Sequence, residues 1–509
     1  MPVVQQGSIN TAALVIPDVY VQIMQPPIVI NGLPTNVLGV VGTASWGPVN
    51  SPVIVGDLRA AVMNFGSPNA RKYDLTTGIW AAALQGANNF RAVRVTDGTD
   101  VAASIAVLTN CITFTAKYTG TLGNQLQVST APGSKANTQK VTVALPGYVP
   151  EVFDNLGAGL SGNALWVAIA SAINNGTDPT RGASALVVAS AGAGVTAPAT
   201  ASYTLTGGTD GATTITGSVL IGQDTVPRKG MYCLRNTGAS VAFLSDCDDS
   251  TTWSTQVAFG LSEGVYMIGT GPAGDTISNA VSVKATAGID SYAFKPLFGD
   301  WVYFNDSVNG VVRMISPQGF IAGRIANLSP EQSSLNKPLY GIVGTQKSYA
   351  NQVYSSAELQ TLAQAGIDVI TNPIPAGNQF GARFGHNSSS LFSIHGDNYT
   401  RMTNFLAYTL NSAMGIFVGR LQSQQANDST RREVKSTIDN FLEVLVQQKM
   451  IDAYQTQCDL GNNLPQRISA GYLQVDVKVR YLSVVEYLIV NLEGGQTVVI
   501  NRVNTSPAS

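Results

Sequence analysis

Residues 75–95, LTTGIWAAALQGANNFRAVRV, combine a helical and a strand-like hydrophobic pattern in one short segment. Leu75, Ile79 and Ala82 recur at the spacing of one helix face. Phe90–Val95 instead alternates between two faces, as a strand does. The segment therefore predicts a helix that runs into a strand, which is the repeating unit of an α/β fold.

The same alternation continues on both sides of this segment. Val37–Val41 is an apolar run typical of a buried strand, and a helix is expected to begin at Asp57 and end near Gly66. Much further along, Val265–Ile268 predicts a strand, Thr276–Ala287 a helix and Trp301–Phe304 another strand. We therefore expect one α/β domain built from two separate parts of the chain.

The composition between these two parts changes to Ala, Thr, Gly, Ser and Val, with few charges. One apolar helix is expected at Leu165–Ile173, and Gly207–Gly211 has turn chemistry suited to a hinge. The remaining signals are short β-like runs separated by turns, which predict an inserted β-rich domain. These runs are Ile112–Tyr118, Leu126–Thr130, Val141–Leu145, Leu186–Ala189 and Tyr203–Thr206.

Two helices are predicted in the C-terminal part of the chain. Ser355–Glu358 is a capping box whose helix should end at Gly366, before a strand at Ile367–Ile370. A longer helix is expected from Thr430, with Glu433 as its reciprocal capping residue. Its apolar positions form one stripe. They are Val434, Ile438, Phe441, Leu442 and Leu445.

The expected fold class is a multidomain α/β (α+β) protein. It has a central α/β domain, an inserted β-rich domain, a C-terminal α+β domain and extended N- and C-terminal arms. The expected boundaries are 1–24 for the N-terminal arm, 25–97 and 217–345 for the α/β domain, 98–216 for the inserted outer domain, 346–480 for the C-terminal inner domain and 481–509 for the C-terminal arm.

Composition excludes several classes of protein. The 509 residues carry 29 Lys and Arg and 31 Asp and Glu, so charged residues are only 12% of the chain and the net charge is −2. Ordinary soluble domains contain about 25% charged residues. Direct nucleic-acid binding is not expected, because there is no basic excess to neutralise phosphates. A hydrophobic content of 44% also argues against a disordered chain.

Targeting, membrane and redox signals are absent from the sequence. No apolar run is long enough to predict a membrane helix, and the N-terminus lacks the basic and apolar regions of a secretion signal. The four cysteines form no C-x-x-C pair, so we expect reduced packing residues. They are Cys111, Cys233, Cys247 and Cys458.

Gly269–Gly274, GTGPAG, matches the G-x-G-x-x-G pattern between a predicted strand and a predicted helix. Such a turn holds a pyrophosphate through consecutive backbone N–H groups, and Pro272 removes one of them. A structural strand-to-helix turn is the favoured interpretation.

Gly260–Gly264, GLSEG, fits the nucleophile elbow G-x-S-x-G. An elbow needs a strand before the serine and a helix after it, whereas β-like residues follow Ser262. His386 or His395 could serve as the base by chain order. A hydrolase with a β-rich accessory domain therefore stays as the alternative function.

Other catalytic patterns are missing. There is no P-loop, and His386 and His395 lack the H-E-x-x-H zinc spacing, so no cofactor and no metal site is expected. Asp246 and the pair Asp248–Asp249 are interpreted as a solvated turn.

An ordered series of short motifs resembles the contractile tail sheath proteins of bacteriophages and related injection particles. Two positions depart from the family pattern: Asp18 replaces a glycine in PDVYV, and Phe384–His386 replaces a frequent Thr-Leu pair. The motifs are Pro17–Val21, Gly39–Pro52, Phe65–Gly66, Phe90–Val95, Phe114–Asn124, Leu205–Gly211, Ser316–Gly319, Ala322–Gly323, Gly366–Asp368 and Gly381–Arg383.

The resemblance implies a structural subunit and not an enzyme. Such a subunit polymerises helically around an inner tail tube, and the sheath contracts by subunit rearrangement to drive the tube through the host envelope. The implied partners are further copies of the chain, the inner tube protein, and baseplate and tail terminator proteins, without direct nucleic-acid contact or membrane insertion. The implied location is the virion tail, after assembly in the host cytoplasm.

The resemblance also implies arms that add strands to the sheets of neighbouring subunits. The candidate donors are Leu14–Ile30, which is interrupted by Pro17, Pro26 and Pro27, and the terminal run Val485–Ile489 within the β-like stretch Val484–Val490. A second β-like run at Thr497–Ile500 could make the C-terminus an edge hairpin instead. Strands paired within one subunit are the alternative for both arms. The candidate exchange residues are Val15, Val19, Val21, Ile23, Val485, Tyr487 and Ile489.

The helix predicted from Thr430 carries Arg431, Arg432 and Lys435 near its start, where cations gain nothing from the helix dipole. Since the resemblance implies that the C-terminal domain faces the inner tube, these three residues are expected to meet acidic tube residues. A solvated basic turn, or pairing within the chain to Glu433 or Asp439, is the alternative.

Overall fold

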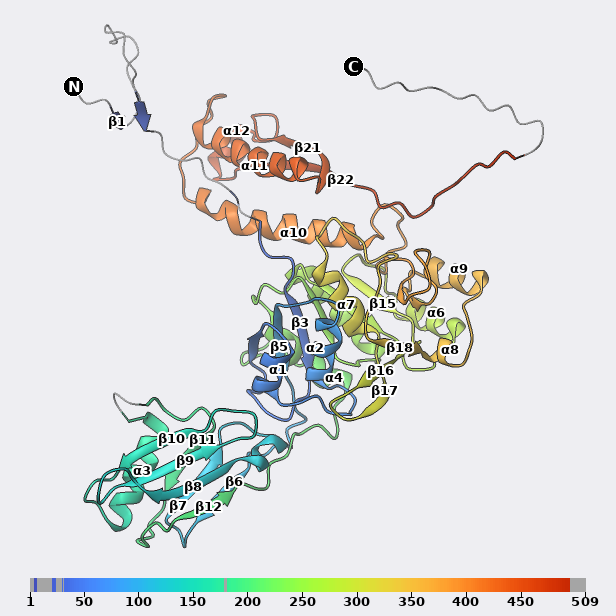
Figure 1. Cartoon of the computed structure of the whole chain (residues 1–509). Coiled ribbons are helices and arrows are strands. Elements are labelled where there is room, and N and C mark those ends of the chain that lie inside the picture. The colour runs from blue at the N-terminus through green and yellow to red at the C-terminus, as the bar shows by residue number, and fades with distance from the viewer. Residues whose placement is uncertain (1–3, 7–20, 24–29, 31, 178–180, 495–509) are drawn as a thin grey trace, which may run out of the picture.

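The computed structural model describes residues 4–6, 21–23, 30, 32–177 and 181–494. Figure 1 shows three bodies along the chain. An inserted β-rich domain lies at one end, an α/β domain lies in the middle, and a smaller domain of helices and two strands lies at the other end. The predicted multidomain α/β fold class is confirmed.

The middle domain is built on a six-stranded sheet with the order β15-β14-β13-β3-β5-β4. All neighbouring pairs are parallel except β4 with β5. Because β3 and β5 precede the inserted domain and β13 to β15 follow it, both parts of the chain share this sheet. The strands are β3 (Leu38–Gly42), β4 (Pro52–Val55), β5 (Phe90–Arg94), β13 (Val241–Leu244), β14 (Tyr266–Thr270) and β15 (Phe294–Leu297).

Both faces of this sheet are covered. On β13, Val241 and Phe243 pack toward a core shared with α2 (Leu75–Ala83) and α7 (Gln318–Asn327). Ala242 and Leu244 point to the opposite core, which includes Trp253 and Phe259 of α5 (Trp253–Glu263). Helices on both faces explain why the parallel strands are mostly apolar, with Arg94 and Lys295 as buried exceptions.

Glycines let α2 and α7 pack unusually close together. A Cβ on Gly323 would lie 2.5 Å from the backbone of Ala82, and a Cβ on Gly319 would lie 3.0 Å from the carbonyl oxygen of Gly78. Only a residue without a side chain fits at such positions. The Ser316–Gly323 motif therefore begins α7 and sets the distance between the two helices.

The inserted domain holds two antiparallel sheets with the orders β10-β9-β8-β12 and β11-β7-β6. The helix α3 (Gly162–Asn175) buries Trp166, Ile169 and Ile173 in the core of this domain. The strands are β6 (Ser104–Val107), β7 (Ile112–Ala116), β8 (Gln127–Pro132), β9 (Gln139–Ala144), β10 (Glu151–Leu156), β11 (Val187–Ala191) and β12 (Ala201–Thr204).

Two side chains fasten the inserted domain to the α/β domain. Arg94, at the end of β5, is fully buried and donates to the carbonyl oxygens of Gly47 and Thr119 at 2.9 and 2.7 Å. Asp210, at the exit of the inserted domain, pairs with Arg71 at 2.5 Å and accepts from the backbone N–H of Thr121 at 2.6 Å. The predicted hinge segment is thus held by hydrogen bonds on both sides.

The remaining part of the middle region contains short elements. The capping box at Ser355 and Glu358 is confirmed and begins α9 (Ser356–Gln364). The other elements are α1 (Leu58–Phe65), α4 (Gly217–Ile221), α6 (Ile277–Thr286), β16 (Val302–Asp306), β17 (Val311–Ile315), β18 (Ile342–Thr345), α8 (Gln346–Tyr349), β19 (Ile370–Thr371) and β20 (Gly381–Ala382).

The C-terminal body consists of α10 (Asp397–Met414), α11 (Ser429–Gln447), β21 (Ile451–Gln457), α12 (Pro465–Ser469) and β22 (Asp476–Tyr481). All five residues of the predicted stripe on α11 are buried, in one core with Met402, Phe405 and Leu406 of α10. The predicted cap is wrong by two residues: Asp428 accepts from the N–H of Arg431 at 2.9 Å and caps the helix.

The N-terminal region contributes one small sheet. β1 (Val4–Gln6) pairs in parallel with β2 (Val21–Ile23), and these two strands make up the whole sheet among the described residues. Pro17, Pro26 and Pro27 lie outside the described residues.

Several sequence expectations need correction or completion. Val484–Val490 is not a strand, and Thr497–Ile500 lies outside the described residues. Asp246 is not solvated: it is 7% exposed and accepts from the N–H of Ser316 at 3.0 Å, and burial raises its pKa. The four cysteines are buried and unbridged, as predicted.

Among the described residues, no helix combines the length and the apolar character needed to cross a membrane. The domain boundaries given from the sequence remain a proposal, and the grouping of strands into sheets supports it.

Candidate functional site

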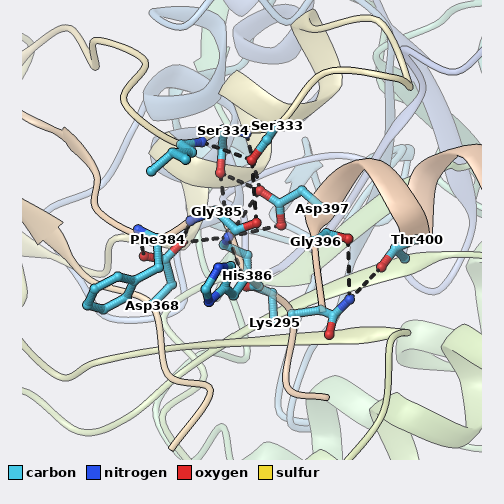
Figure 2. A network of polar contacts seen from close by, with 12 residues as sticks. Lys295, Ser333, Ser334, Asp368, Phe384, Gly385, His386, Gly396, Asp397 and Thr400 are labelled. Atoms are coloured by element: carbon cyan, nitrogen blue, oxygen red, sulfur yellow. Dashed lines mark hydrogen bonds and ion pairs between the residues drawn. The ribbon is translucent and has the colours of Figure 1, made fainter. Parts of the chain in front are cut away.

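The N-terminal half of α10 is anchored in the α/β domain by a buried ion-pair network (Figure 2). Lys295 of β15 is fully buried, and its Nζ lies 2.7 Å from Asp368 and 3.0 Å from Asp397, the first residue of α10. Tyr266 donates to Asp397 at 2.6 Å, and Asp368 accepts from the N–H groups of Phe384 and Gly385 at 3.0 and 2.9 Å. Both carboxylates are therefore fully engaged within the chain.

The network keeps its charges in spite of burial. Burial alone would lower the pKa of Lys295, but Asp368 and Asp397 outweigh it and raise that pKa. For Asp397, burial would raise the pKa, but Lys295 and hydrogen bonds from Ser334 and Tyr266 hold it below its usual value. Since the three side chains are completely enclosed, we interpret the network as a structural joint.

Arg401, one turn further along α10, makes a second joint. It is 4% exposed and donates to the carbonyl oxygens of Leu328 and Ser329 at 2.7 and 2.9 Å, and to that of Thr35 at 3.1 Å. Burial lowers the pKa of Arg401 to about 10. The first turns of α10 thus bind the α/β domain, while Phe405 and Leu406, further along the helix, belong to the C-terminal core.

The three basic residues at the start of α11 have different surroundings. Arg431 is 2% exposed; its guanidinium donates to the carbonyl oxygens of Ser423, at 2.6 Å, and Gln425. It ties down the loop before α11 and offers no side chain to a partner in this conformation. Arg432 is exposed, and Lys435 pairs with Asp439 at 2.6 Å.

An exposed apolar loop lies beside this helix start. Ile416, Val418 and Leu421, between α10 and α11, are 48, 85 and 92% exposed. Arg420 in the same loop pairs with Glu433 of α11 at 2.8 Å. Sequence reasoning missed this loop, because the apolar run Ile416–Val418 is too short to show a helical or strand period.

The segment that follows β22 is apolar, extended and exposed. Among the candidate exchange residues, Val485, Tyr487 and Ile489 are 74, 76 and 81% exposed. Leu488, Val490 and Leu492, which point to the other face of an extended chain, are 74 to 89% exposed. No described residue from 482 to 494 lies in a helix or strand.

A groove of about 920 Å³ lies where this segment leaves the C-terminal body. Its apolar lining comes from α10, α11 and β22, and residues 482–487 pass along it. Because the sheet beside it has only two strands, β22 has one edge that no described strand covers. The apolar lining residues include Leu406, Leu410, Leu442, Val477 and Val479.

The N-terminal exchange candidates divide into two groups. Val15 and Val19 lie outside the described residues. Val21 and Ile23 lie in β2, where their backbone partners are Val4 and Gln6 of the same chain. Pairing within one subunit, the alternative considered from the sequence, therefore holds for β2.

The GTGPAG turn joins β14 to α6 as expected, but the N–H groups of Gly271 and Gly274 are already used. Gly271 donates to Leu297 at 3.0 Å, and Gly274 donates to Gly299 at 2.9 Å and to the Gln346 side chain at 2.8 Å. The Trp301 indole also donates to the Gly271 carbonyl oxygen at 3.0 Å. The turn is a packing element with no free amide cradle for a pyrophosphate.

The GLSEG motif is not a nucleophile elbow. Ser262 lies in the last turn of α5, and its hydroxyl donates to the carbonyl oxygen of Phe259 at 3.0 Å. A strand follows Ser262 where an elbow needs a helix.

The two histidines meet each other and a glutamate. Their rings stack with centroids 3.9 Å apart. The Glu486 carboxylate lies 3.5 Å from Nε2 of His386 and 3.0 Å from Nε2 of His395. One donor atom from each of the three residues falls within a group spanning 4.8 Å, which is compact enough to hold a metal ion. Sequence spacing could not reveal this cluster, because Glu486 lies 91 residues beyond His395.

The arrangement of sheets, of the inserted domain and of the C-terminal body matches known sheath proteins. Residues 393–493 match the family model described as the phage tail sheath C-terminal domain. No curated protein is similar enough in sequence to match the chain.

Solved structures match over nearly the whole chain. The sheath tail protein of Desulfitobacterium hafniense aligns with a TM-score of 0.57 and 16% identity, covering 87% of this chain and 93% of that one. The sheath tail protein of Listeria innocua gives 0.59 and 14%, covering 89% and 96%. The sheath complex of an extracellular contractile injection system, PVC, in its contracted state gives 0.53 and 12%, covering 96% and 99%.

These matches confirm the resemblance to contractile tail sheath proteins. The chain has the sheath fold over most of its length, and its residues 393–493 match the sheath C-terminal domain.

Proposed function

We propose that the chain is the structural subunit of a contractile tail sheath. It polymerises helically around an inner tail tube, and the sheath contracts by rearrangement of its subunits and so drives the tube through the host envelope. The observation that carries this proposal is the exposed apolar segment 484–492 beside a sheet of only two strands, in a chain with the sheath fold. The assembled location is the tail of the virion, after assembly in the host cytoplasm.

The C-terminal arm supplies a strand to a neighbouring subunit. Val485, Tyr487 and Ile489 share one face of an extended chain, and the opposite face carries the apolar Leu488 and Val490 beyond Glu486. A segment with two apolar faces suits a strand that is covered on both sides. In one subunit these side chains are exposed, so a second copy of the chain is the partner that covers them.

The acceptor is the sheet of β21 and β22. Isolated two-stranded sheets are marginal in water and gain from further strands. Each of the two strands has one edge free of described partners, and the groove of about 920 Å³ adjoins β22. Main-chain hydrogen bonds would connect the subunits, and alternate side chains would set the register.

The N-terminal arm, residues 1–24, makes the second connection. Val15, Val19, Val21 and Ile23 remain its candidate exchange residues. The pairing of β1 with β2 supports an arm that already has strand geometry before it meets a neighbour.

The surface proposed to meet the inner tube lies at the start of α11. Arg432 and Lys435 supply its positive charge, and acidic residues of the tube protein are their expected partners. Arg431 contributes indirectly, by fixing the loop that precedes α11. Baseplate and tail terminator proteins are the proposed partners at the two ends of the polymer.

Contraction draws its free energy from subunit packing, with the extended polymer metastable and the contracted polymer lower in free energy. The subunit is not an enzyme in this proposal, and no nucleotide, cofactor, direct nucleic-acid contact or membrane insertion is part of it. The alternative, an α/β hydrolase-like enzyme, would need Ser262 as a nucleophile.

Electron microscopy of the purified full-length chain tests the proposal. We expect tubes or helical polymers from the intact chain, and folded monomers after deletion of residues 1–24 or 484–509. Serine substitutions at Val485, Tyr487 and Ile489 should also abolish polymers, whereas Val149→Ser, at an equally exposed site of the inserted domain, should not. Tubes that persist after both deletions would refute the proposal that the arms connect the subunits. Compact particles with Ser262-dependent ester hydrolysis would favour the enzyme.

A further inference from the structure

The only two histidines of the chain, His386 and His395, converge on one carboxylate. The carboxylate belongs to Glu486, the acidic residue of the apolar C-terminal segment from 484 to 490. Two side chains from a rigid loop and one from a separate segment therefore meet at a single point.

Backbone contacts that do not involve Glu486 fix the two histidine positions. His386 and Gly396 form an antiparallel bridge, and Asn387 donates through its backbone N–H to the carbonyl oxygen of His395 at 2.7 Å. The Asn387 amide, which is fully buried, also donates to Ile394 at 2.7 Å and to Thr400 at 3.0 Å. Figure 2 shows His386 beside the buried network, where its carbonyl oxygen accepts from Lys295 at 3.1 Å. A backbone held in this way keeps both rings on the same side of the loop.

The distances suit a small divalent ion. In a tetrahedral site with bonds of about 2.0–2.2 Å, neighbouring donor atoms lie about 3.3–3.6 Å apart. Glu486 lies 3.5 Å from one Nε2 and 3.0 Å from the other, and the whole donor set spans less than 4.8 Å. The donor atoms are therefore near the spacing that a tetrahedral ion requires.

The surroundings also favour an ion over bulk water. The side chains of His386, His395 and Glu486 are only 13, 14 and 18% exposed. Phe384 stacks on His386 at 6.0 Å between centroids, and Phe392 meets the edge of His395 at 4.7 Å. The nearby Lys295 charge is matched by Asp368 and Asp397, so it leaves no excess positive charge to repel a cation.

We propose that His386, His395 and Glu486 form a binding site for a divalent transition-metal ion of the zinc class, which fastens the start of the C-terminal segment to the loop before α10. Two imidazoles and one carboxylate are a donor set that suits Zn²⁺ and leaves one position for water. The site does not depend on the sheath function, because it lies within one chain. Its role is to fix the point from which residues 487–494 extend.

Metal titration of the untagged, EDTA-treated and desalted full-length chain tests the site, with Co²⁺ as a spectroscopic probe. We expect one equivalent of Co²⁺ per chain, visible d–d absorption of a nitrogen and oxygen donor set, and displacement by Zn²⁺. The thiolate-to-cobalt charge-transfer band should be missing, which separates this site from the four buried cysteines.

Variants identify the ligands. Glu486→Gln and His395→Asn should each weaken Co²⁺ binding at least tenfold, while Glu493→Gln, a carboxylate of the same segment outside the cluster, should bind like the wild type. Glu486 lies outside the helices and strands, so Glu486→Gln should leave the circular dichroism spectrum unchanged.

Limited proteolysis gives a second readout. Zn²⁺ should slow cleavage after residue 483 several-fold in the wild type and leave Glu486→Gln unchanged. Failure of the wild type to bind Co²⁺ stoichiometrically, or equal binding by Glu486→Gln, would overturn the site and leave a plain hydrogen-bonded His–Glu cluster.

Discussion

Lys295 of β15 and Asp397 of α10 form an ion pair of 3.0 Å in which both side chains are fully buried. The pair joins the central sheet to the first residue of a helix whose later residues lie in the C-terminal core. Asp368 completes it at 2.7 Å, so one lysine links three separate parts of the chain. Buried ion pairs therefore hold the α/β domain and α10 together.

Replacing Lys295 by methionine should strongly destabilise the protein. The substitution leaves two carboxylates buried without their cation, which costs about 3–5 kcal/mol in the free energy of unfolding. Chemical denaturation measures the loss. Lys72→Met is the matched control: Lys72 pairs with Asp248 at 2.8 Å but its side chain is 43% exposed, so about 1 kcal/mol or less is expected. Equal losses in the two variants would contradict the interpretation.

The apolar stripe of α11 should account for much of the stability of the C-terminal body. Leu442→Ala removes a fully buried side chain and should cost about 2–5 kcal/mol in the free energy of unfolding. Val444→Ala, two residues away on the same helix and 46% exposed, should cost under about 1 kcal/mol. Thermal unfolding of both variants checks the difference, and a similar shift in Tm would argue against the packing of α11 on α10.

Substitutions at Arg431 and Arg432 should have different effects: the first should lower stability, and the second should weaken binding to the inner tube. Arg431→Met leaves the carbonyl oxygens of Ser423 and Gln425 without their donor and should cost about 1–3 kcal/mol in the free energy of unfolding. Arg432→Glu should change that free energy by less than about 0.5 kcal/mol, because the side chain is exposed. Its effect should appear as weaker co-sedimentation with the inner tube protein. Unchanged binding by Arg432→Glu together with Lys435→Glu would exclude the proposed tube surface.

The capping box of α9 predicts a defined pH dependence. The side-chain hydrogen bond from Lys347 and the N–H of Ser355 lower the pKa of Glu358 from 4.5 to about 2. The folded state therefore favours the carboxylate, and this contribution is complete above about pH 4.5 and is lost as pH falls toward 2.

Glu358→Gln keeps an oxygen that can accept from the N–H of Ser355 but removes the charge. The Tm difference between wild type and Glu358→Gln should be largest at pH 6 and shrink between pH 4.5 and the lowest pH at which the protein stays folded. A Tm difference that grows on acidification would have the wrong sign.

Much of the α/β domain could be predicted from local patterns. The run at Val37–Val41 becomes β3, Asp57 caps α1, and Ser355 with Glu358 forms the capping box of α9. These features depend on neighbouring residues only, and a single sequence contains them. The cap of α11 was misplaced because Asp428, Ser429 and Thr430 are all good capping residues and the loop contacts decide among them.

The candidate sites depend on contacts between residues far apart in the sequence, so they were harder to predict. The sequence around Lys295 contains no signal that predicts its ion pairs with Asp368 and Asp397. Arg431 and Arg432 are adjacent in the sequence, yet one is buried and the other exposed because only Arg431 points toward the preceding loop. The C-terminal run 484–490 has β propensity, and from the sequence we predict that it forms an arm. It is not a strand in the structure, because no described strand of its own chain pairs with it.

The helix α10 has a mechanical consequence. It has 18 residues, a length of about 27 Å, with Asp397 and Arg401 clamped in one domain and Phe405 and Leu406 packed in the other. Because α10 is fixed in both domains, it resists bending. A rotation of the C-terminal body is therefore transmitted to the α/β domain. In the polymer proposed above, such a subunit would turn as one rigid body, and the proposed arm beyond Tyr481 would keep neighbouring subunits connected while they turn.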